Sequence, residues 1–203
     1  MSSDFQLPVD VKLTGSDVTK SRFQAPLREG WYKFRVKFAE ATQTSSVKGT
    51  FYSQLTLVPL DEADNEAKRT KIKYKLYYPF RTASGHKPNT MGVCEQYLAA
   101  AMPKKFTKPK RTANGYTLNG EDVTPAEAKE LYAAIDTQVA EELNLRAEDS
   151  QRFLGDEFYG KVVHKVNENN PDQVFPEVVA FSFSATAPEG VDIITSDFTS
   201  AED

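Results

Sequence analysis

Cysteine is almost absent from this chain of 203 residues, and long apolar runs are absent altogether. The only cysteine is Cys94, so a disulfide framework is excluded and a reducing compartment is expected. No run approaches the roughly 18 apolar residues of a membrane helix. The first residues, MSSDFQLPVD, lack the basic and apolar regions of a signal peptide. The sequence therefore predicts a cytoplasmic protein without a membrane partner, in the host-cell cytoplasm if the protein is viral.

Basic residues are missing from the end of the chain. Beyond Lys165 there is no lysine or arginine, whereas there are eight acids. Residues 112–203 carry 5 Lys/Arg against 19 Asp/Glu, a net charge of −14, while residues 68–111 carry 12 against the single acid Glu95, a net charge of +11. Residues 1–67 carry 8 against 9, which completes the total of −4. This asymmetry predicts a middle segment that binds a polyanion, followed by an acidic tail.

Motifs of catalysis and metal binding are also missing. The chain has no C-x-x-C, H-E-x-x-H or GxxxxGK[ST] pattern, and its two histidines are far apart in the sequence. We expect no catalytic residues, no bound metal and no cofactor. A weaker alternative is a metal-dependent nuclease that uses the carboxylates between Glu141 and Asp156. These acids are more simply interpreted as helix caps and solvent-facing groups.

Three segments of the N-terminal half alternate apolar and polar residues, as strands with one buried face do. In WYKFRVKF and FYSQLTLVPL, the positions expected to face inward include Phe38 and Phe51. The residues expected to face outward from the three strands are Trp31, Lys33, Arg35, Lys37, Tyr52, Arg69, Lys71, Lys73, Lys75 and Tyr77.

Two helices and a basic loop are predicted next. The first helix begins at Asn89 or Thr90 and ends before Pro103. The second begins at TPAE with Thr124 as N-cap and Glu127 closing a capping box. Between them lies a turn-rich loop with two Asn-Gly pairs, which predict tight turns. Its cations and the aromatic ring among them are Lys104, Lys105, Phe106, Lys108, Lys110 and Arg111.

The chain returns to strands after Gly155. FYGKVVHKV and EVVAFSFSA are predicted as the fourth and fifth strands, separated by the turn cluster NENNPDQ, and the last strand is expected to bury Phe181. Five strands with a helix between the third and fourth follow the order of the OB-fold, a Greek-key barrel. A generic α+β sheet is the competing interpretation.

The fold class expected is therefore mainly β with inserted helices. Residues 29–186 are expected to form the OB-fold barrel, with a helical and basic-loop insertion at about 81–155. Residues 1–28 are predicted as an N-terminal arm or edge strand, and residues 187–203 as a flexible acidic tail.

The alternating cations and rings predict a surface for single-stranded nucleic acid, in which lysines track phosphates and aromatic rings stack on bases. All the outward strand residues and the basic-loop residues named above are candidates for this site. The simpler alternative is that the lysines keep the sheet soluble and protect an edge. Stacking and phosphate contacts do not separate DNA from RNA, and the pattern leaves a homo-oligomer open.

The segments GWYKFRV, KGTFYSQLTLVPLDE, KIKYKLYYPF, GKVVHKVNENNPDQVFPEVVAF and DFTSAED together resemble OB-fold single-stranded DNA-binding proteins of tailed bacteriophages. The resemblance implies sequence-tolerant coating of DNA during replication, recombination or repair, and a tail that recruits replication proteins. The tail residues concerned are Asp192, Asp197, Phe198, Glu202 and Asp203. Family tails often end in an aromatic residue, whereas Phe198 lies five residues before the end. A protein-interaction or virion assembly role is the main alternative.

Overall fold

The alternating segments of the N-terminal half form three antiparallel strands, β1 (Gly30–Ala39), β3 (Phe51–Pro59) and β4 (Ile72–Tyr77). β3 pairs with both β1 and β4, and the short β2 (Gln43–Thr44) continues the pairing of β1 along β3. The structure is a computed structural model that describes residues 27–44, 51–67, 70–78, 90–167 and 170–198. Arg69, Glu202, Asp203 and the greater part of the expected N-terminal arm lie outside the described residues.

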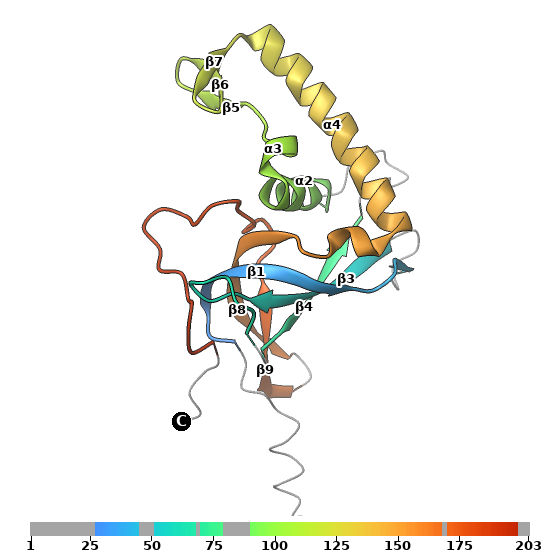
Figure 1. Ribbon diagram of the computed structural model, residues 1–203, viewed down its shortest axis with the longest axis vertical. Coiled ribbons are helices and arrows are strands. Elements are labelled where there is room, and N and C mark those ends of the chain that lie inside the picture. The colour runs from blue at the N-terminus through green and yellow to red at the C-terminus, as the bar shows by residue number, and fades with distance from the viewer. Residues whose placement is uncertain (1–26, 45–50, 68–69, 79–89, 168–169, 199–203) are drawn as a thin grey trace, which may run out of the picture.

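Two later strands complete the sheet. β8 (Glu157–Asn167) pairs with β1, and β9 (Asn170–Val178) pairs with β8, both antiparallel. The strand order is therefore β4-β3-β1-β8-β9, and β9 also approaches β4. As a result, five antiparallel strands nearly close into a barrel (Figure 1). The prediction of a mainly β fold with a five-stranded barrel-like sheet is confirmed at this level.

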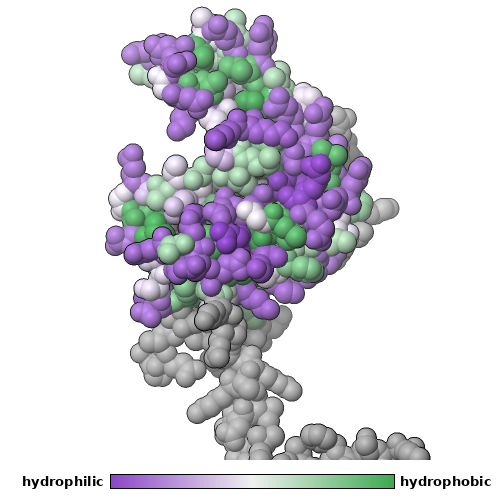
Figure 2. Space-filling view, viewed as in Figure 1, coloured by the Kyte–Doolittle hydropathy of each residue, from purple (hydrophilic) through white to green (hydrophobic). Residues whose placement is uncertain are grey.

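Helices and a second small sheet lie between β4 and β8. α2 (Thr90–Ala101) covers one end of the barrel, and α4 (Pro125–Glu148) runs from the barrel to a three-stranded sheet at its far end (Figure 1). The remaining elements of this region are α3 (Pro103–Phe106), β5 (Lys110–Thr112), β6 (Gly115–Leu118), β7 (Glu121–Val123) and the 3-10 helix η1 (Ser150–Phe153). Figure 2 shows a hollow between the barrel and the lobe that β5–β7 form with the adjoining half of α4.

Local sequence signals explain where these elements begin and turn. Thr124 caps α4 and forms the expected reciprocal capping box with Glu127. Asn119 and Gly120 both have positive φ, 55° and 90°, as a two-residue turn of type I′ between paired strands requires. The other tight turn, Ala113–Asn114, connects β5 to β6, and Gly115 begins β6. Both predicted tight turns and the capped helix are confirmed.

A β-bulge in β1 shows that the prediction of an inward-facing Phe38 is wrong. The pairing between β1 and β3 shifts between Val36 and Phe38, so one extra residue is inserted into β1. A bulge interrupts the alternation of side chains between the two faces of a strand. Lys37 and Phe38 are therefore both exposed, and Phe38 is 52% exposed instead of buried. Phe51, also expected inside, is 48% exposed because it lies at the very start of β3.

The core is aromatic and joins the barrel to α2. Tyr97 of α2 is fully buried and its ring packs against Phe153, Phe158 and Phe183 with centroid separations of 5.4–5.9 Å. Burying a large apolar side chain stabilises a fold by about 1.5–3 kcal/mol. α2 is thereby anchored over the barrel end, which fixes the position of everything that follows it.

The C-terminal segment departs from two predictions. The last strand ends at Val178, and Phe181 is 55% exposed rather than buried, since the chain has already left the sheet. Residues up to Phe198 are not a free tail: Phe198 packs on Tyr32 with centroids 6.2 Å apart, and its carbonyl accepts a hydrogen bond from the amide of Arg28. Apolar side chains in the acidic segment hold it against the barrel. Among the described residues, no helix is both long and apolar enough to cross a membrane.

Candidate nucleic-acid interface

The outer face of β3 and β4 brings together rings and lysines. Because Ser53, Leu55 and Leu76 are fully buried, their neighbours along the two strands point outward. The antiparallel register then sets these outward residues side by side. The cross-strand pairs are Tyr52 with Tyr77, Gln54 with Lys75, and Thr56 with Lys73. This face is the one that the sequence predicted for strands two and three.

An aromatic pair lies at one end of this face. The rings of Tyr52 and Tyr77 have centroids 5.4 Å apart and are inclined by 47°. The hydroxyl of Tyr52 donates to the side-chain carbonyl of Gln43 at 2.8 Å, which fixes the ring. Lys75 places its ammonium 4.8 Å from the centroid of Tyr52, a cation–π contact. Two fixed rings beside a cation are the elements needed to stack bases and hold the phosphate between them.

The cations of this face are accessible. Lys71, Lys73 and Lys75 are all exposed. Lys73 is 61% exposed and its only ion pair among the described residues is a long one, 3.5 Å, to Glu40. Exposed pairs of this kind contribute about 0–1 kcal/mol, so a phosphate can replace the carboxylate. These three lysines therefore remain available to a polyanion.

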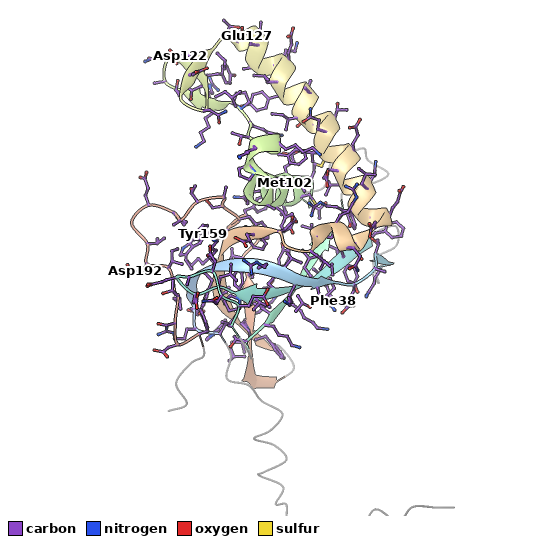
Figure 3. All side chains as sticks on the ribbon, viewed as in Figure 1. Phe38, Met102, Asp122, Glu127, Tyr159 and Asp192 are labelled. Atoms are coloured by element: carbon purple, nitrogen blue, oxygen red, sulfur yellow. The ribbon has the colours of Figure 1, made fainter. Side chains whose placement is uncertain are left out.

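Phe38 adds a ring that the sequence interpretation missed. Phe38 pairs with Thr56, which in turn pairs with Lys73, so the three residues form one row across the outer face of the sheet. The ring lies on the surface of the barrel (Figure 3). The period-2 pattern placed Phe38 inside, and no local signal marked the bulge that turns it outward.

The outward cations of β1 have a different environment. Lys33 forms ion pairs with Asp64 at 2.6 Å and with Glu157 at 3.2 Å. Arg35 binds the same Glu157 at 2.5 Å. The hydrogen bond to Asp64 raises the pKa of Lys33, and the hydrogen bond to Glu157 raises that of Arg35. Lys33 and Arg35, which the sequence predicted as nucleic-acid contacts, are therefore engaged with acids in the structure.

The connection between β3 and β4 supplies the other acids, Asp64 and Glu66, that pair with the cations of β1. Glu66 lies 2.8 Å from Lys37 and 3.4 Å from Arg35. The hydrogen bond from Lys37 lowers the pKa of Glu66. Asp61 holds the turn by accepting hydrogen bonds from the amides of Ala63 and Asn65. This connection therefore lies over the outer face of β1 and covers much of its charge.

Trp31 is half-buried beside the C-terminal segment. It forms an isolated parallel bridge with Ile193, and its carbonyl accepts a hydrogen bond from the amide of Ile194. Asp192 and Asp197 of the same segment are exposed. Trp31 is thus separated from the Tyr52–Tyr77 pair by the neutralised cations of β1.

Some residues of the basic loop are buried or ion-paired, and others are exposed. Phe106, expected as a stacking ring, is 1% exposed and belongs to the core. Lys105 pairs with Glu142 at 2.8 Å, and Lys108 pairs with both Glu95 and Asp136. Burial alone would lower the pKa of Lys108, but the hydrogen bonds to these two acids outweigh it and raise the pKa. The loop residues that remain exposed without a described ion pair are Lys104, Lys110 and Arg111.

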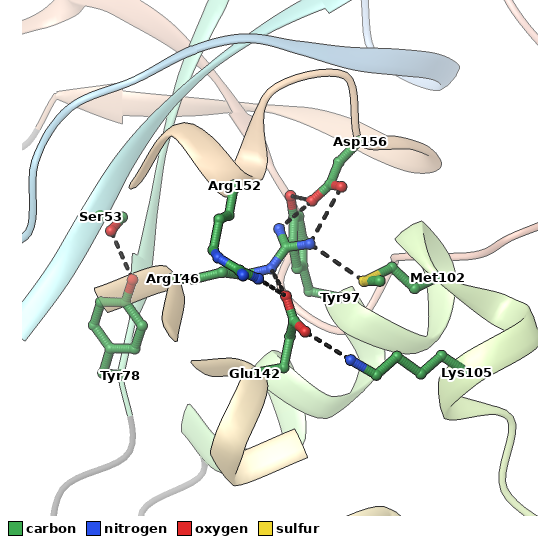
Figure 4. A network of polar contacts seen from close by, with 9 residues as sticks. All are labelled: Ser53, Tyr78, Tyr97, Met102, Lys105, Glu142, Arg146, Arg152 and Asp156. Carbon is green, nitrogen blue, oxygen red and sulfur yellow. Dashed lines mark hydrogen bonds and ion pairs between the residues drawn. The ribbon is translucent and has the colours of Figure 1, made fainter. Parts of the chain in front are cut away.

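The acids between Glu141 and Asp156 include a buried network rather than solvent-facing groups alone. Arg146, 2% exposed in its side chain, binds Glu142 at 3.0 Å and also binds Asp156 (Figure 4). The hydroxyl of Tyr97 donates to Asp156 at 2.8 Å. Burial alone would raise the pKa of Glu142, but hydrogen bonds from Lys105 and Arg146 lower it. The network attaches α4 to α2 and to the start of β8, and it engages two of the carboxylates of the nuclease alternative, Glu142 and Asp156.

Groups suited to catalysis are scarce in the part of the chain that the structure describes. Cys94 is buried and its thiol donates to the carbonyl of Tyr77; burial raises its pKa to about 12, far from that of a nucleophile. His164 bonds to the carbonyl of Leu27. Within the described ranges, no three acids, histidines or cysteines cluster as metal ligands. His86 lies outside the described residues.

No protein-family model matches this chain, and no curated protein is significantly similar to it.

Proposed function

We propose that the barrel is an OB-fold. The first of the five long strands pairs with the second and fourth, the second with the third, and the fourth with the fifth. The approach of β9 to β4 supplies the remaining contact of the closed Greek-key order. The region that contains α2 and α4 then corresponds to an insertion between the third and fourth strands.

On this fold we propose a non-enzymatic protein that binds single-stranded DNA. The observation that carries the proposal is the Tyr52–Tyr77 pair beside exposed Lys71, Lys73 and Lys75 on the outer face of β3 and β4. Single strands lie across this face in OB-folds. The interface would therefore be narrower than the sequence suggested, since it excludes the paired cations of β1 and the buried Phe106.

The chemistry of the face favours binding without sequence preference. Every base has a π-face that can stack on a tyrosine ring, and lysines contact phosphates whatever the base. Duplex DNA keeps its bases stacked on one another, so the rings gain nothing from it. A protein of this kind coats exposed single strands during replication, recombination or repair. Exposed Asp192 and Asp197 would face partner proteins of that machinery.

The test is a fluorescence titration of the full chain with matched single-stranded and double-stranded oligonucleotides at two salt concentrations. We expect preferential binding of the single strand and a steep loss of affinity with salt, because phosphate binding releases counterions. An RNA strand of the same sequence measures the preference between the two nucleic acids. Failure to bind a 30-residue oligo(dT) at low salt refutes the proposal, and Mg²⁺-dependent loss of the oligonucleotide would instead favour the nuclease.

A further inference from the structure

A pocket lies between the ends of β3 and β4 and the C-terminal half of α4. It has a volume of about 430 Å³, within the range of about 300–1,000 Å³ typical of ligand pockets. Its walls come from the ends of both strands, from α2 and from α4. The lining residues that matter here are Thr42, Phe51, Tyr78, Met91, Ala140 and Asn144.

The pocket lies at the ends of the same two strands that carry the aromatic pair. Phe51 precedes Tyr52 in β3, and Tyr78 follows Tyr77 at the end of β4. The amide of Tyr78 donates to the carbonyl of Phe51 at 2.8 Å, so these two residues extend the register that pairs the tyrosines. Alternation turns the side chains of Phe51 and Tyr78 to the side of the sheet opposite the tyrosine pair, toward α4. A chain that leaves the aromatic pair therefore reaches Phe51 by turning over the end of β3.

The lining favours a flat, mostly apolar group with a polar edge. The described walls are aromatic or aliphatic apart from Thr42 and Asn144, and none of the described lining residues is charged. Thr42 already donates its hydroxyl hydrogen to the carbonyl of Ala147 at 2.6 Å. The exposed Asn144 amide offers both a donor and an acceptor. The described lining offers a phosphate no cation, whereas it offers a nucleobase a ring to stack on and an amide to bind.

We infer that this pocket receives one nucleobase of the strand bound on the β3–β4 face, stacked on Phe51 with its polar edge toward Asn144. The inference rests on the proposed function and adds to it a defined subsite. A single base held away from its neighbours would set the register of the strand on the protein. Because the site contacts the base rather than the phosphate, it adds affinity without adding salt dependence.

The decisive variant is Ala140→Phe, which fills the pocket from an exposed position on α4. The matched control is Ala133→Phe, an exposed alanine of the same helix that does not line the pocket. For a 30-residue oligo(dT), we expect Ala140→Phe to weaken binding about tenfold, consistent with the loss of one base stack. The control is expected to stay within twofold of the parent protein, and the slope of log K against log salt to stay unchanged in both.

Asn144→Ala provides a second route if Ala140→Phe disturbs folding, which thermal unfolding would reveal. We expect it to weaken binding about threefold for oligo(dT) and not at all for an oligonucleotide of abasic sites. Photocrosslinking with 4-thiothymidine should label the peptide that carries Phe51 or Met91. Oligo(dT) binding that is unchanged in both pocket variants overturns the inference and leaves the proposed function standing. A parent protein that binds no oligonucleotide overturns both proposals. A pocket that admits only an apolar side chain of a partner protein would give no crosslink at Phe51 or Met91, and that result would also overturn the inference.

Discussion

The outer faces of β1 and of β3–β4 carry similar sequence patterns and have different environments. β1 and β4 each alternate lysine or arginine with apolar residues and include an aromatic ring on the outward side. On β1 the acids Asp64, Glu66 and Glu157 bind the cations. On β4 the described residues provide a single long ion pair, from Lys73 to Glu40. The difference shows that a count of cations along a strand does not measure the charge that a ligand can use.

The largest expected effect concerns the rings. Replacing Tyr52 and Tyr77 together with alanine should weaken binding of single-stranded DNA by about 1–3 kcal/mol for each base stack removed. The counterpart on β1, Trp31→Ala, should cost less affinity, because Trp31 is half-buried beside the C-terminal segment. Fluorescence anisotropy with oligo(dT) measures both. Equal losses from the two faces would remove the distinction between them.

The next effect concerns the lysines and the salt dependence. Changing Lys71, Lys73 and Lys75 to glutamine should reduce the slope of log K against log salt by about 0.7 for each phosphate that the protein no longer neutralises. The matched triple variant of β1, at Lys33, Arg35 and Lys37, should leave the slope nearly unchanged. A titration series from low to high salt gives both slopes. A large change in the β1 variant would show that its ion pairs open when DNA binds.

A smaller effect is expected when the common partner of the β1 cations is removed. Glu157→Gln takes a carboxylate away from both Lys33 and Arg35. The free energy of unfolding should fall by about 0.5–1 kcal/mol, as for a partly exposed ion pair. DNA affinity should rise a few-fold because the released cations can contact phosphates. Urea denaturation and an oligo(dT) titration test the two parts separately, and unchanged affinity would mean that the β1 face lies outside the ligand path.

The smallest effect is the acid titration of Glu66. Its pKa is lowered below the ordinary 4.5 by the hydrogen bond from Lys37. A group whose pKa is lower in the folded state stabilises the fold above its unfolded pKa, and the contribution disappears as the pH falls through the folded value. Glu66→Gln should therefore destabilise the protein by tenths of a kcal/mol at pH 7, and the difference should shrink as the pH falls below 4.5. A stability difference that does not shrink with pH would assign the effect to packing rather than to charge.

Much of the barrel could be predicted from the sequence because its signals are local. The inward set of β4 follows directly from alternation, and the start of α4 follows from the capping box formed by Thr124 and Glu127. Phe38 and Phe51 were misplaced for local reasons too, since a bulge and a strand end interrupt the period. The alternation of apolar and polar residues does not indicate where a bulge occurs or where a strand begins.

The candidate site was predicted less completely, because whether a cation or a ring can contact a ligand depends on residues that are distant in the sequence. Arg35 meets Glu157 across 122 positions of the chain, and Lys33 meets Asp64 across 31. Phe106 sits among lysines in the sequence but is buried in the core, with Lys105 bound to Glu142 of α4. The pocket next to Phe51 and Asn144 is likewise lined by residues of β3, β4, α2 and α4, so no contiguous motif predicts it.

By itself the sequence determined most strands of the barrel, the capped helix, the tight turns and the charge contrast between the middle and the end of the chain. Each of these depends on neighbours a few residues apart, through backbone dihedrals, side-chain alternation and local hydrogen bonds. Only the tertiary structure decided which cations stay free, which rings face solvent and where a pocket opens. Those outcomes depend on burial and on Coulomb interactions between groups that folding brings within a few ångströms, and sequence distance does not encode that proximity.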